Sequence, residues 1–333
     1  MATSRAIRIH RNGGPEELQL ETMDVGPPGP DEVRLRQTAI GLNFTDIHHR
    51  TGRYPGGGFP LTLGMEAAGV IDAVGSNVFD MKVGDRVVYG GASPSLMPGA
   101  YCELRIMAPA KLVKLPDWID DETAAAVYLK GLTAQYLIRG AHPIQRGQTV
   151  LIHAVAGGVG LLMCQWARHL GATVIGTTSS PEKAAIAREH GCHHPIVSTT
   201  EDVVARVREL TGGQGVPVVY DSVGASTFEI SLSCLARRGM AVSFGSSSGP
   251  VPPLDIFRLN RMGSLYLTGA GFADYTAERS ELLERAAELF EVVKSGAVRV
   301  TIGQRYALAD AAQAHRDLQE RRTIGSSVLI PQS

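Results

Sequence analysis

The pattern of hydrophobic and polar positions changes near residue 125. Before it, short β-branched runs such as 32–42, 67–75 and 84–90 lie between turns rich in glycine and proline, which predicts short strands. The segment 121–140, "DETAAAVYLKGLTAQYLIRG", is instead apolar, alanine-rich and acidic at its start, as a helix would be. We therefore expect a β-rich domain over residues 1–125.

Strand-like and helix-like segments alternate after residue 148. "TVLIHA", "TVIGTT", "HPIVS", "VPVVYDSV" and "MAVSFG" predict strands, and the longer segments between them, including 226–239, predict helices. This alternation is typical of βαβ units in a doubly wound parallel sheet, expected over residues 126–270. A long amphipathic helix over 277–296, a second helix over 310–322 and a strand over 326–331 follow, and we expect residues 271–333 to return to the first domain.

Composition and charge favour a cytoplasmic protein that binds small molecules or copies of itself. The 333 residues carry 32 basic and 33 acidic side chains, a net charge of −1, which gives no preference for nucleic acid or an anionic membrane. The four cysteines are far apart and form no C-x-x-C pair, as in a reduced compartment. The N-terminal segment has no apolar signal region, and the most apolar stretch, 149–167, contains His153 and three glycines, so we expect neither secretion nor a membrane span.

A phosphate-binding turn is predicted at residues 150–160, "VLIHAVAGGVG". A hydrophobic strand ends there in a glycine turn that leads into a helix, the context of a dinucleotide fingerprint. Gly157 can let the backbone approach a pyrophosphate, and Gly160 can let helix and strand pack closely. Val155 occupies the place of the usual first glycine, so a glycine turn that binds nothing stays an alternative.

The end of the next strand indicates which dinucleotide is bound. An NAD site needs Asp or Glu about 20 residues after the fingerprint to bind the ribose 2′-hydroxyl. Here the strand ends "GTTSSPEK", with no carboxylate at its tip. Ser179 and Lys183 could bind a 2′-phosphate by hydrogen bond and point charge, which favours NADPH. The alternative for Lys183 is an exposed lysine in the first turn of a helix, beside Glu182.

The segment 41–55, "GLNFTDIHHRTGRYP", gathers Asp46, His48 and His49 and could be a metal site, a proton relay or a polar loop. In an extended segment adjacent histidines point to opposite sides, so both rarely reach one ion. We expect no metal, with Asp46 holding the backbone of the segment.

Seven motifs in this order carry a resemblance that spans essentially the whole chain. They are "GLNFTD", "LGMEAAGVI", "KVGDRVVY", "KGLTAQYL", "AVAGGVG", "VVYDSVG" and "RRTIGSSVLIP". With them the chain resembles the zinc-independent quinone oxidoreductases of the medium-chain dehydrogenase/reductase superfamily. The resemblance implies a GroES-like catalytic domain built from both termini, a Rossmann domain between them, NADPH bound in the cleft, a quinone substrate and a homodimer.

The same resemblance implies that no catalytic zinc is bound. Zinc-dependent relatives have a cysteine at Asn43 and Gly-His-Glu at Gly64-Met65-Glu66. Neither asparagine nor methionine is a good zinc ligand, and the four-cysteine lobe of a structural zinc is missing.

The site residues follow from the family's motifs. Asn43 is expected close to the nicotinamide, where its amide can donate to a carbonyl of the substrate or of the carboxamide. Thr133 is expected at the nicotinamide end, and Lys130 to bridge to the cleft. The remaining cofactor-binding positions are Ala156, Gly157, Gly158 and Val159 at the pyrophosphate, Ser179 and Lys183 at the 2′-phosphate, Ser222 beside the ribose, Phe244, Gly245 and Ser246 under the nicotinamide ribose, and Arg321 reaching back from the C-terminal segment.

Two positions depart from the family's pattern. Related bacterial enzymes often have tyrosine at Ser198, near adenine and phosphate, so its absence can weaken the preference for NADPH. His48 stands where relatives can have tyrosine, whereas Tyr54 is retained; its alternative is a tyrosine that holds a proline turn.

The implied reaction is hydride transfer from C4 of NADPH to a quinone. Donors aimed at the quinone oxygen would stabilise its negative charge, and the candidates are Asn43, Tyr54 and His48. With an ordinary pKa of about 6.5, His48 could deliver a proton, or it could be a solvated loop histidine. The alternatives to a quinone reductase are an NADPH-dependent enoyl or alkenal reductase and, in another class, a crystallin-like protein of low turnover that binds NADPH or RNA.

Overall fold

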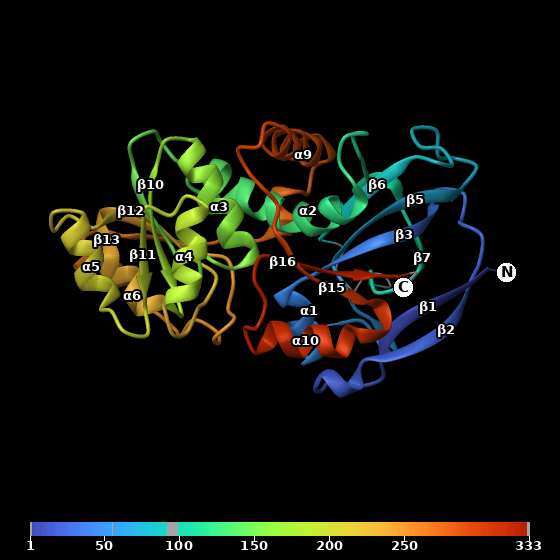
Figure 1. Ribbon diagram of the computed structural model, residues 1–333, viewed down its shortest axis with the longest axis horizontal. Coiled ribbons are helices and arrows are strands. Elements are labelled where there is room, and N and C mark those ends of the chain that lie inside the picture. Colours follow the sequence, from blue (N-terminus) through green and yellow to red (C-terminus); the bar gives the residue numbers. More distant parts are fainter. Residues whose placement is uncertain (1, 55, 92–98, 332–333) are drawn as a thin grey trace. The chain divides into compact units, whose positions relative to one another are not determined.

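The structure, a computed structural model, describes residues 2–54, 56–91 and 99–331 (Figure 1). The chain forms two compact units, residues 1–130 with 282–286 and 300–333, and residues 131–281 with 287–299. The limits expected from the sequence, 1–125 with 271–333 and 126–270, stay predictions for the boundaries of independently folding domains.

The first unit is built on a seven-stranded sheet with the order β15-β16-β3-β5-β6-β8, in which β7 also pairs with β3. The strands are β3 (Val33–Leu42), β5 (Glu66–Val74), β6 (Arg86–Gly90), β7 (Leu104–Met107), β8 (Val113–Lys114), β15 (Ile302–Ala307) and β16 (Ser326–Ile330). A smaller sheet joins β1 (Ala2–Ile9), β2 (Gln19–Val25) and β4 (Leu61–Thr62). Strand β16 pairs antiparallel with β3, so the C-terminal strand completes the sheet of the N-terminal segment.

Alternation along β3 shows why the sheet forms. Val33 and Leu35 are fully buried in the core of the unit, whereas Arg34 and Arg36 face the other side and both pair with Asp72 of the neighbouring strand β5. Period-two alternation of this kind gives each strand one buried and one polar face.

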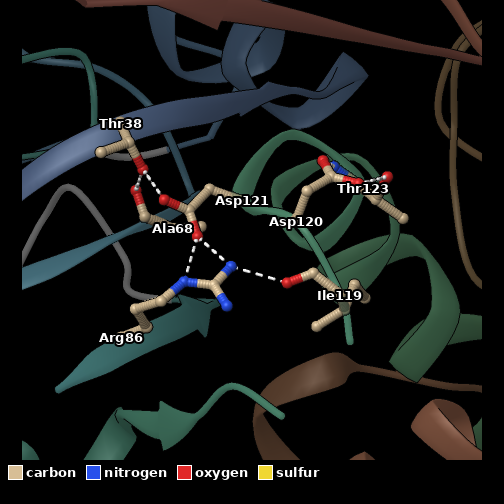
Figure 2. A network of polar contacts seen from close by, with 7 residues as sticks. All are labelled: Thr38, Ala68, Arg86, Ile119, Asp120, Asp121 and Thr123. Atoms are coloured by element: carbon tan, nitrogen blue, oxygen red, sulfur yellow. Dashed lines mark hydrogen bonds and ion pairs between the residues drawn. The ribbon is translucent and has the colours of Figure 1, made fainter. Parts of the chain in front are cut away.

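Helix α2 (Asp121–Tyr136) is fixed to the sheet of the first unit at its N-terminus, as Figure 2 shows. The Asp121 carboxylate accepts hydrogen bonds from Thr38 of β3, at 2.6 Å, and from Nε of Arg86 of β6, at 3.0 Å. Asp120 caps the helix by accepting the backbone N–H and the hydroxyl of Thr123, at 2.8 and 2.7 Å. The position of the helix along the sheet is therefore set by charge-assisted hydrogen bonds.

The second unit is a six-stranded parallel sheet in the order β11-β10-β9-β12-β13-β14. Its strands are β9 (Thr149–Ile152), β10 (Thr173–Thr178), β11 (His194–Val197), β12 (Val216–Asp221), β13 (Leu235–Ser243) and β14 (Tyr266–Gly269). The order reverses between β9 and β12, which is the topology of a doubly wound Rossmann fold and confirms the predicted fold class.

Helices connect these strands (Figure 1). They are α3 (Gly158–His169), α4 (Pro181–Glu189), α5 (Val203–Leu210), α6 (Phe228–Cys234) and α7 (Ile256–Arg261). Helices α8 (Phe272–Tyr275) and α9 (Arg279–Lys294) follow the last strand, β14, while α1 (Phe44–Arg50) and α10 (Ala311–Gln319) belong to the first unit. Within the described ranges, no helix has both the length and the apolar character needed to span a membrane.

The helix predicted over 226–239 is too long. Helix α6 ends at Cys234, and Leu235 is already extended and buried as the first residue of β13. The register between β12 and β13 shifts at this point, and Arg238 has a φ of +62°. The irregular start of the strand therefore removes the period-two signal from the sequence.

Candidate active site

The segment 41–55 contains a helix, which corrects the expectation of an extended loop. Asn43 is the extended N-cap of α1, with φ −133° and ψ 152°, and it forms a capping box with Asp46. Oδ2 of Asp46 accepts the backbone N–H of Asn43 at 2.9 Å. Asp46 thus holds the backbone, as expected, while helical geometry rather than strand alternation sets the directions of His48 and His49.

His48 lies in an aromatic cluster and is not solvated. Its ring centroid is 4.8 Å from that of Tyr54 and 5.2 Å from that of Phe44, and the side chain is buried. Burial, together with the charges of Arg53 and His49, lowers the pKa of His48 to about 4. His48 is therefore neutral at pH 7, which corrects both the proton-donor role based on an ordinary pKa and the solvated alternative.

A buried carboxylate, Glu66, joins Asn43 to helix α2. Oε1 of Glu66 accepts from Nδ2 of Asn43 at 2.8 Å and from Nζ of Lys130 at 2.9 Å, and Oε2 accepts the backbone N–H of Leu129 at 2.6 Å. Glu66 is fully buried, and the Lys130 side chain is 8 % exposed. Glu66 lies in the motif "LGMEAAGVI", but the motif alone does not indicate that Glu66 pairs with Lys130.

The Asn43 amide faces Glu66 with its nitrogen. Besides the bond to Glu66, Nδ2 lies 3.4 Å from the carbonyl oxygen of Gly41. Both N–H groups are directed at acceptors within the protein. This differs from the expectation that Asn43 donates to a carbonyl of substrate or cofactor.

A series of hydrogen bonds between buried side chains connects the two ends of α1 through Tyr101 and His315. Nη1 of Arg50 lies 3.0 Å from Nδ1 of His315, Nε2 of His315 lies 3.0 Å from the Tyr101 hydroxyl, and that hydroxyl donates to Oδ2 of Asp46 at 2.9 Å. Because arginine only donates, Nδ1 of His315 accepts and Nε2 carries the hydrogen. Burial lowers the pKa of His315 to about 3, so the ring is neutral in this role. No local sequence pattern predicts these hydrogen bonds, since Tyr101 and His315 are 214 positions apart.

Burial also raises the pKa of Asp46 to about 7, against hydrogen bonds from Asn43 and Tyr101 that lower it. Its side chain has no solvent exposure, and its second oxygen, Oδ1, has no hydrogen-bond partner.

In the part of the chain that the structure describes, no group of three or more His, Cys, Asp or Glu side chains is arranged to hold a metal ion.

The predicted phosphate-binding turn joins β9 to α3. Gly157 is the N-cap of α3, no side chain caps the helix, and its first turn carries no acidic residue. A Cβ on Gly160 would lie 2.5 Å from the carbonyl oxygen of Ala154, so only glycine allows this close packing. Val155, which stands in place of the first glycine, is fully buried, and its N–H donates to Thr177. The backbone N–H of Gly157 donates to the carbonyl of Ala154, while the positive N-terminal end of the helix that follows fits a pyrophosphate over Ala156, Gly157, Gly158 and Val159.

The neighbouring strands end in small polar residues. Strand β10 ends at Thr178, Ser179 follows, and Ser180 caps α4, with the backbone N–H of Lys183 donating to its hydroxyl. Val197, at the end of β11, pairs with Thr178, and Ser198 donates to the carbonyl of Thr178 at 3.0 Å. The structure therefore brings Ser179, Lys183 and Ser198 to one edge of the sheet. No carboxylate directly follows β10, whereas at the end of β11 Oε1 of Glu201 accepts the backbone N–H of Val197 at 2.7 Å.

Strands β12 and β13 complete this edge. Asp221 and Ser243 pair at their ends, and Ser222 and Phe244–Ser246 follow them. The backbone N–H of Phe244 donates to the carbonyl of Asp221 at 2.9 Å. A Cβ on Gly245 would lie 2.6 Å from the carbonyl of Ser222, so the two turns approach as closely as glycine permits. Ligands of doubly wound sheets bind at this carboxyl edge, where the strand order reverses.

The other predicted residues lie elsewhere. Thr133 lies in the part of α2 that belongs to the second unit, whereas Lys130 and Asn43 belong to the first. Arg321 follows α10 in the first unit and has a φ of +59°. Their roles at the cofactor stay predictions.

Two family models match the chain, and both describe domains of the medium-chain dehydrogenase/reductase class. "Alcohol dehydrogenase GroES-like domain" matches residues 29–117, and "Zinc-binding dehydrogenase" matches residues 158–288. The chain is 52 % identical to a quinone oxidoreductase of Pseudomonas aeruginosa, over 98 % of this chain and 100 % of the relative. It is 46 % identical to a 2-haloacrylate reductase of a Burkholderia species, over 98 % of this chain and 99 % of the relative.

A solved structure agrees with these relatives. The quinone oxidoreductase of Escherichia coli, complexed with NADPH, superposes with a TM-score of 0.95 at 45 % identity, over 99 % of this chain and 100 % of that one. The chain belongs to the zinc-independent quinone oxidoreductases of the medium-chain dehydrogenase/reductase superfamily.

Proposed function

We propose that the protein is an NADPH-dependent quinone oxidoreductase that works without zinc. The observation that supports this proposal most strongly is the arrangement of residues at the carboxyl edge of the Rossmann sheet. There the glycine turn before α3 is next to β10, which ends at Thr178 and is followed by Ser179 rather than by a carboxylate, and Lys183 lies in the first turn of α4. The relatives named above, including one complexed with NADPH, support it.

The residues of the chain bind and orient the reactants. NADPH, when bound, supplies a hydride from C4 of its nicotinamide ring. Residues 156–159 would hold its pyrophosphate, Ser179 and Lys183 its 2′-phosphate, and Ser222 with Phe244–Ser246 the ribose side. Asn43, Lys130, Thr133 and Arg321 are proposed near the nicotinamide end. The buried His48 ring and the half-buried Tyr54 ring would form an apolar wall for a flat, aromatic acceptor.

A second candidate is an NADPH-dependent reductase of activated C=C bonds. The 46 % identity to a 2-haloacrylate reductase over nearly the full chain favours it. The same hydride position serves a quinone and an enone, because both accept a hydride at an electron-poor carbon conjugated to a carbonyl group.

Steady-state kinetics with two acceptor panels separates these functions. We expect kcat/KM for 1,4-benzoquinone and naphthoquinones to exceed that for enones and haloacrylates. The reverse order would assign the second candidate. Negligible turnover of both panels, together with salt-sensitive RNA binding, would assign the crystallin-like alternative.

We also propose a cytoplasmic homodimer. Within the described residues Cys102, Cys164, Cys192 and Cys234 are all free and buried, as in a reducing compartment. Strand β14 is an edge strand with Tyr266 52 % exposed, and Phe257 of α7 in the same unit is 70 % exposed. An exposed edge with large apolar side chains favours pairing with a second copy. Light scattering at micromolar concentration should give twice the mass of the chain.

A further inference from the structure

The carboxylate of Glu66 is surrounded by hydrogen-bond donors only. Its oxygens receive Nδ2 of Asn43, Nζ of Lys130 and the backbone N–H of Leu129, at 2.8, 2.9 and 2.6 Å. An ionised carboxylate accepts at both oxygens and donates at neither, so it satisfies all three donors at once. The ammonium group of Lys130 balances the buried charge.

Gly41 makes this approach possible. A Cβ at residue 41 would lie 2.2 Å from Oε1 of Glu66 and 2.4 Å from the carbonyl oxygen of Ala125. Any side chain there would therefore push Glu66 away from Asn43. The contact between Glu66 and Asn43 therefore depends on the glycine at the start of the "GLNFTD" segment.

The orientation of the Asn43 amide follows from these contacts. Its nitrogen faces the carboxylate of Glu66 and the carbonyl of Gly41, both of which only accept. A flipped amide would place the Asn43 oxygen against both of them. Asn43 is 8 % exposed, and the oxygen of its amide points away from Glu66. In the capping box this oxygen accepts the backbone N–H of Asp46 with one lone pair, which leaves the second lone pair for another donor.

We propose that Glu66, charge-balanced by Lys130, is a positioning residue that makes Asn43 a hydrogen-bond acceptor for the carboxamide N–H of bound NADPH. This inference rests on the proposed function and gives Asn43 a definite polarity. An oxidised quinone presents carbonyl oxygens, which only accept, and so it cannot pair with the Asn43 oxygen. The carboxamide of the nicotinamide offers an N–H₂ group, which can.

A cofactor analogue tests the polarity. The reduced 3-acetylpyridine analogue of NADPH keeps the ring carbonyl but replaces the N–H₂ group with a methyl group. We expect the wild-type protein to bind NADPH about tenfold more tightly than this analogue, by calorimetry without acceptor, because one hydrogen bond is lost. In Glu66→Gln the ratio of the two dissociation constants should fall close to one. The N–H₂ group of glutamine would face the three donors that now bind Glu66, so the Asn43 amide would no longer be held in one orientation.

Glu122→Gln is the matched control, because it changes a half-exposed carboxylate that pairs with Arg305 in the same unit. Its ratio should equal the wild-type ratio. Weaker binding of both ligands to Glu66→Gln with an unchanged ratio would overturn the proposal, since that is the result of a merely structural role. Equal binding of both ligands by the wild-type protein would also overturn it.

A second variant tests the proposal if Glu66→Gln does not fold. Asn43→Leu keeps the size of the side chain and removes its oxygen, so it should lose the preference for NADPH over the analogue. A preference that survives in Asn43→Leu overturns the inference. If the wild-type protein bound no NADPH, the proposed function itself would fail, which is a different result.

Discussion

Tyr101 donates its hydroxyl hydrogen to Oδ2 of Asp46 over 2.9 Å, and both side chains are fully buried. The same oxygen of Asp46 accepts the backbone N–H that begins helix α1. The two residues, which are 55 positions apart, therefore fix the start of the helix that carries His48.

Replacing Tyr101 by phenylalanine should destabilise the protein by about 1–3 kcal/mol, since both Asp46 and His315 lose a buried hydrogen-bond partner. The free energy of unfolding in urea measures this. Tyr306→Phe is the control, because Tyr306 makes the same kind of bond to Asp317 at a half-buried position. A loss in Tyr101→Phe no larger than in Tyr306→Phe would contradict the role of the buried chain.

Asp46 should make stability depend on pH between about 4 and 7. Burial raises the pKa of Asp46 from 3.8 to about 7, so the native state keeps a proton that the unfolded chain releases. The contribution of the protonated Asp46 carboxyl group to the free energy of unfolding is fully present below about pH 4 and is lost as the pH rises through 7. Asp46→Asn stays neutral, so its stability relative to the wild type should increase from pH 5 to pH 8, by on the order of 2 kcal/mol.

Asp317→Asn provides the control for this titration. Hydrogen bonds from Arg322 and Tyr306 lower the pKa of Asp317. Its contribution to stability is lost only as the pH falls below the ordinary range of a carboxylate, so the difference from the wild type should stay constant between pH 5 and pH 8. A constant difference for Asp46→Asn as well would contradict the raised pKa.

Lys183→Ala should raise the dissociation constant of NADPH about tenfold and leave that of NADH unchanged, because only NADPH carries the 2′-phosphate. Calorimetry with both cofactors measures this, and Lys294→Ala, at the exposed end of α9, serves as the control. Equal affinities of the wild-type protein for NADPH and NADH would contradict the assignment of Ser179 and Lys183.

His48→Phe should change turnover or the range of acceptors without changing NADPH affinity, because His48 packs on Tyr54 and Phe44. With its pKa lowered to about 4, His48 should give no inflection in kcat between pH 6 and pH 8. His169→Phe, at an exposed position of α3, is the control. An inflection near pH 6.5 that disappears in His48→Phe would show that His48 titrates during turnover.

Activity should survive dialysis against EDTA. Asn43 and Met65 stand where zinc-dependent relatives have ligands, and neither side chain binds zinc well. Turnover before and after dialysis, with protein dialysed against buffer alone as the control, measures this. A loss of activity that zinc restores would contradict a metal-free site.

The Rossmann sheet and the turn before α3 could be predicted from the sequence, because β-branched strands, glycine turns and helix starts are local signals. Helix α1 could not, since the polar residues of "NFTDIHHR" gave no apolar stripe. Its stability comes instead from the Asn43–Asp46 capping box and from Tyr101, which lies far along the chain. The lowered pKa of His48 likewise depends on burial, which a sequence pattern does not give.

The ion pair between Lys130 and Glu66 also affects whether a metal site could be engineered into the first unit. Restoring a zinc site by Asn43→Cys and Met65→His would leave the ammonium group 2.9 Å from Glu66. A divalent cation brought to that carboxylate would meet a fixed positive charge in a poorly solvated place, where repulsion between like charges is strong. Conversion of this scaffold to metal-dependent chemistry therefore requires the removal of Lys130 together with the installation of ligands.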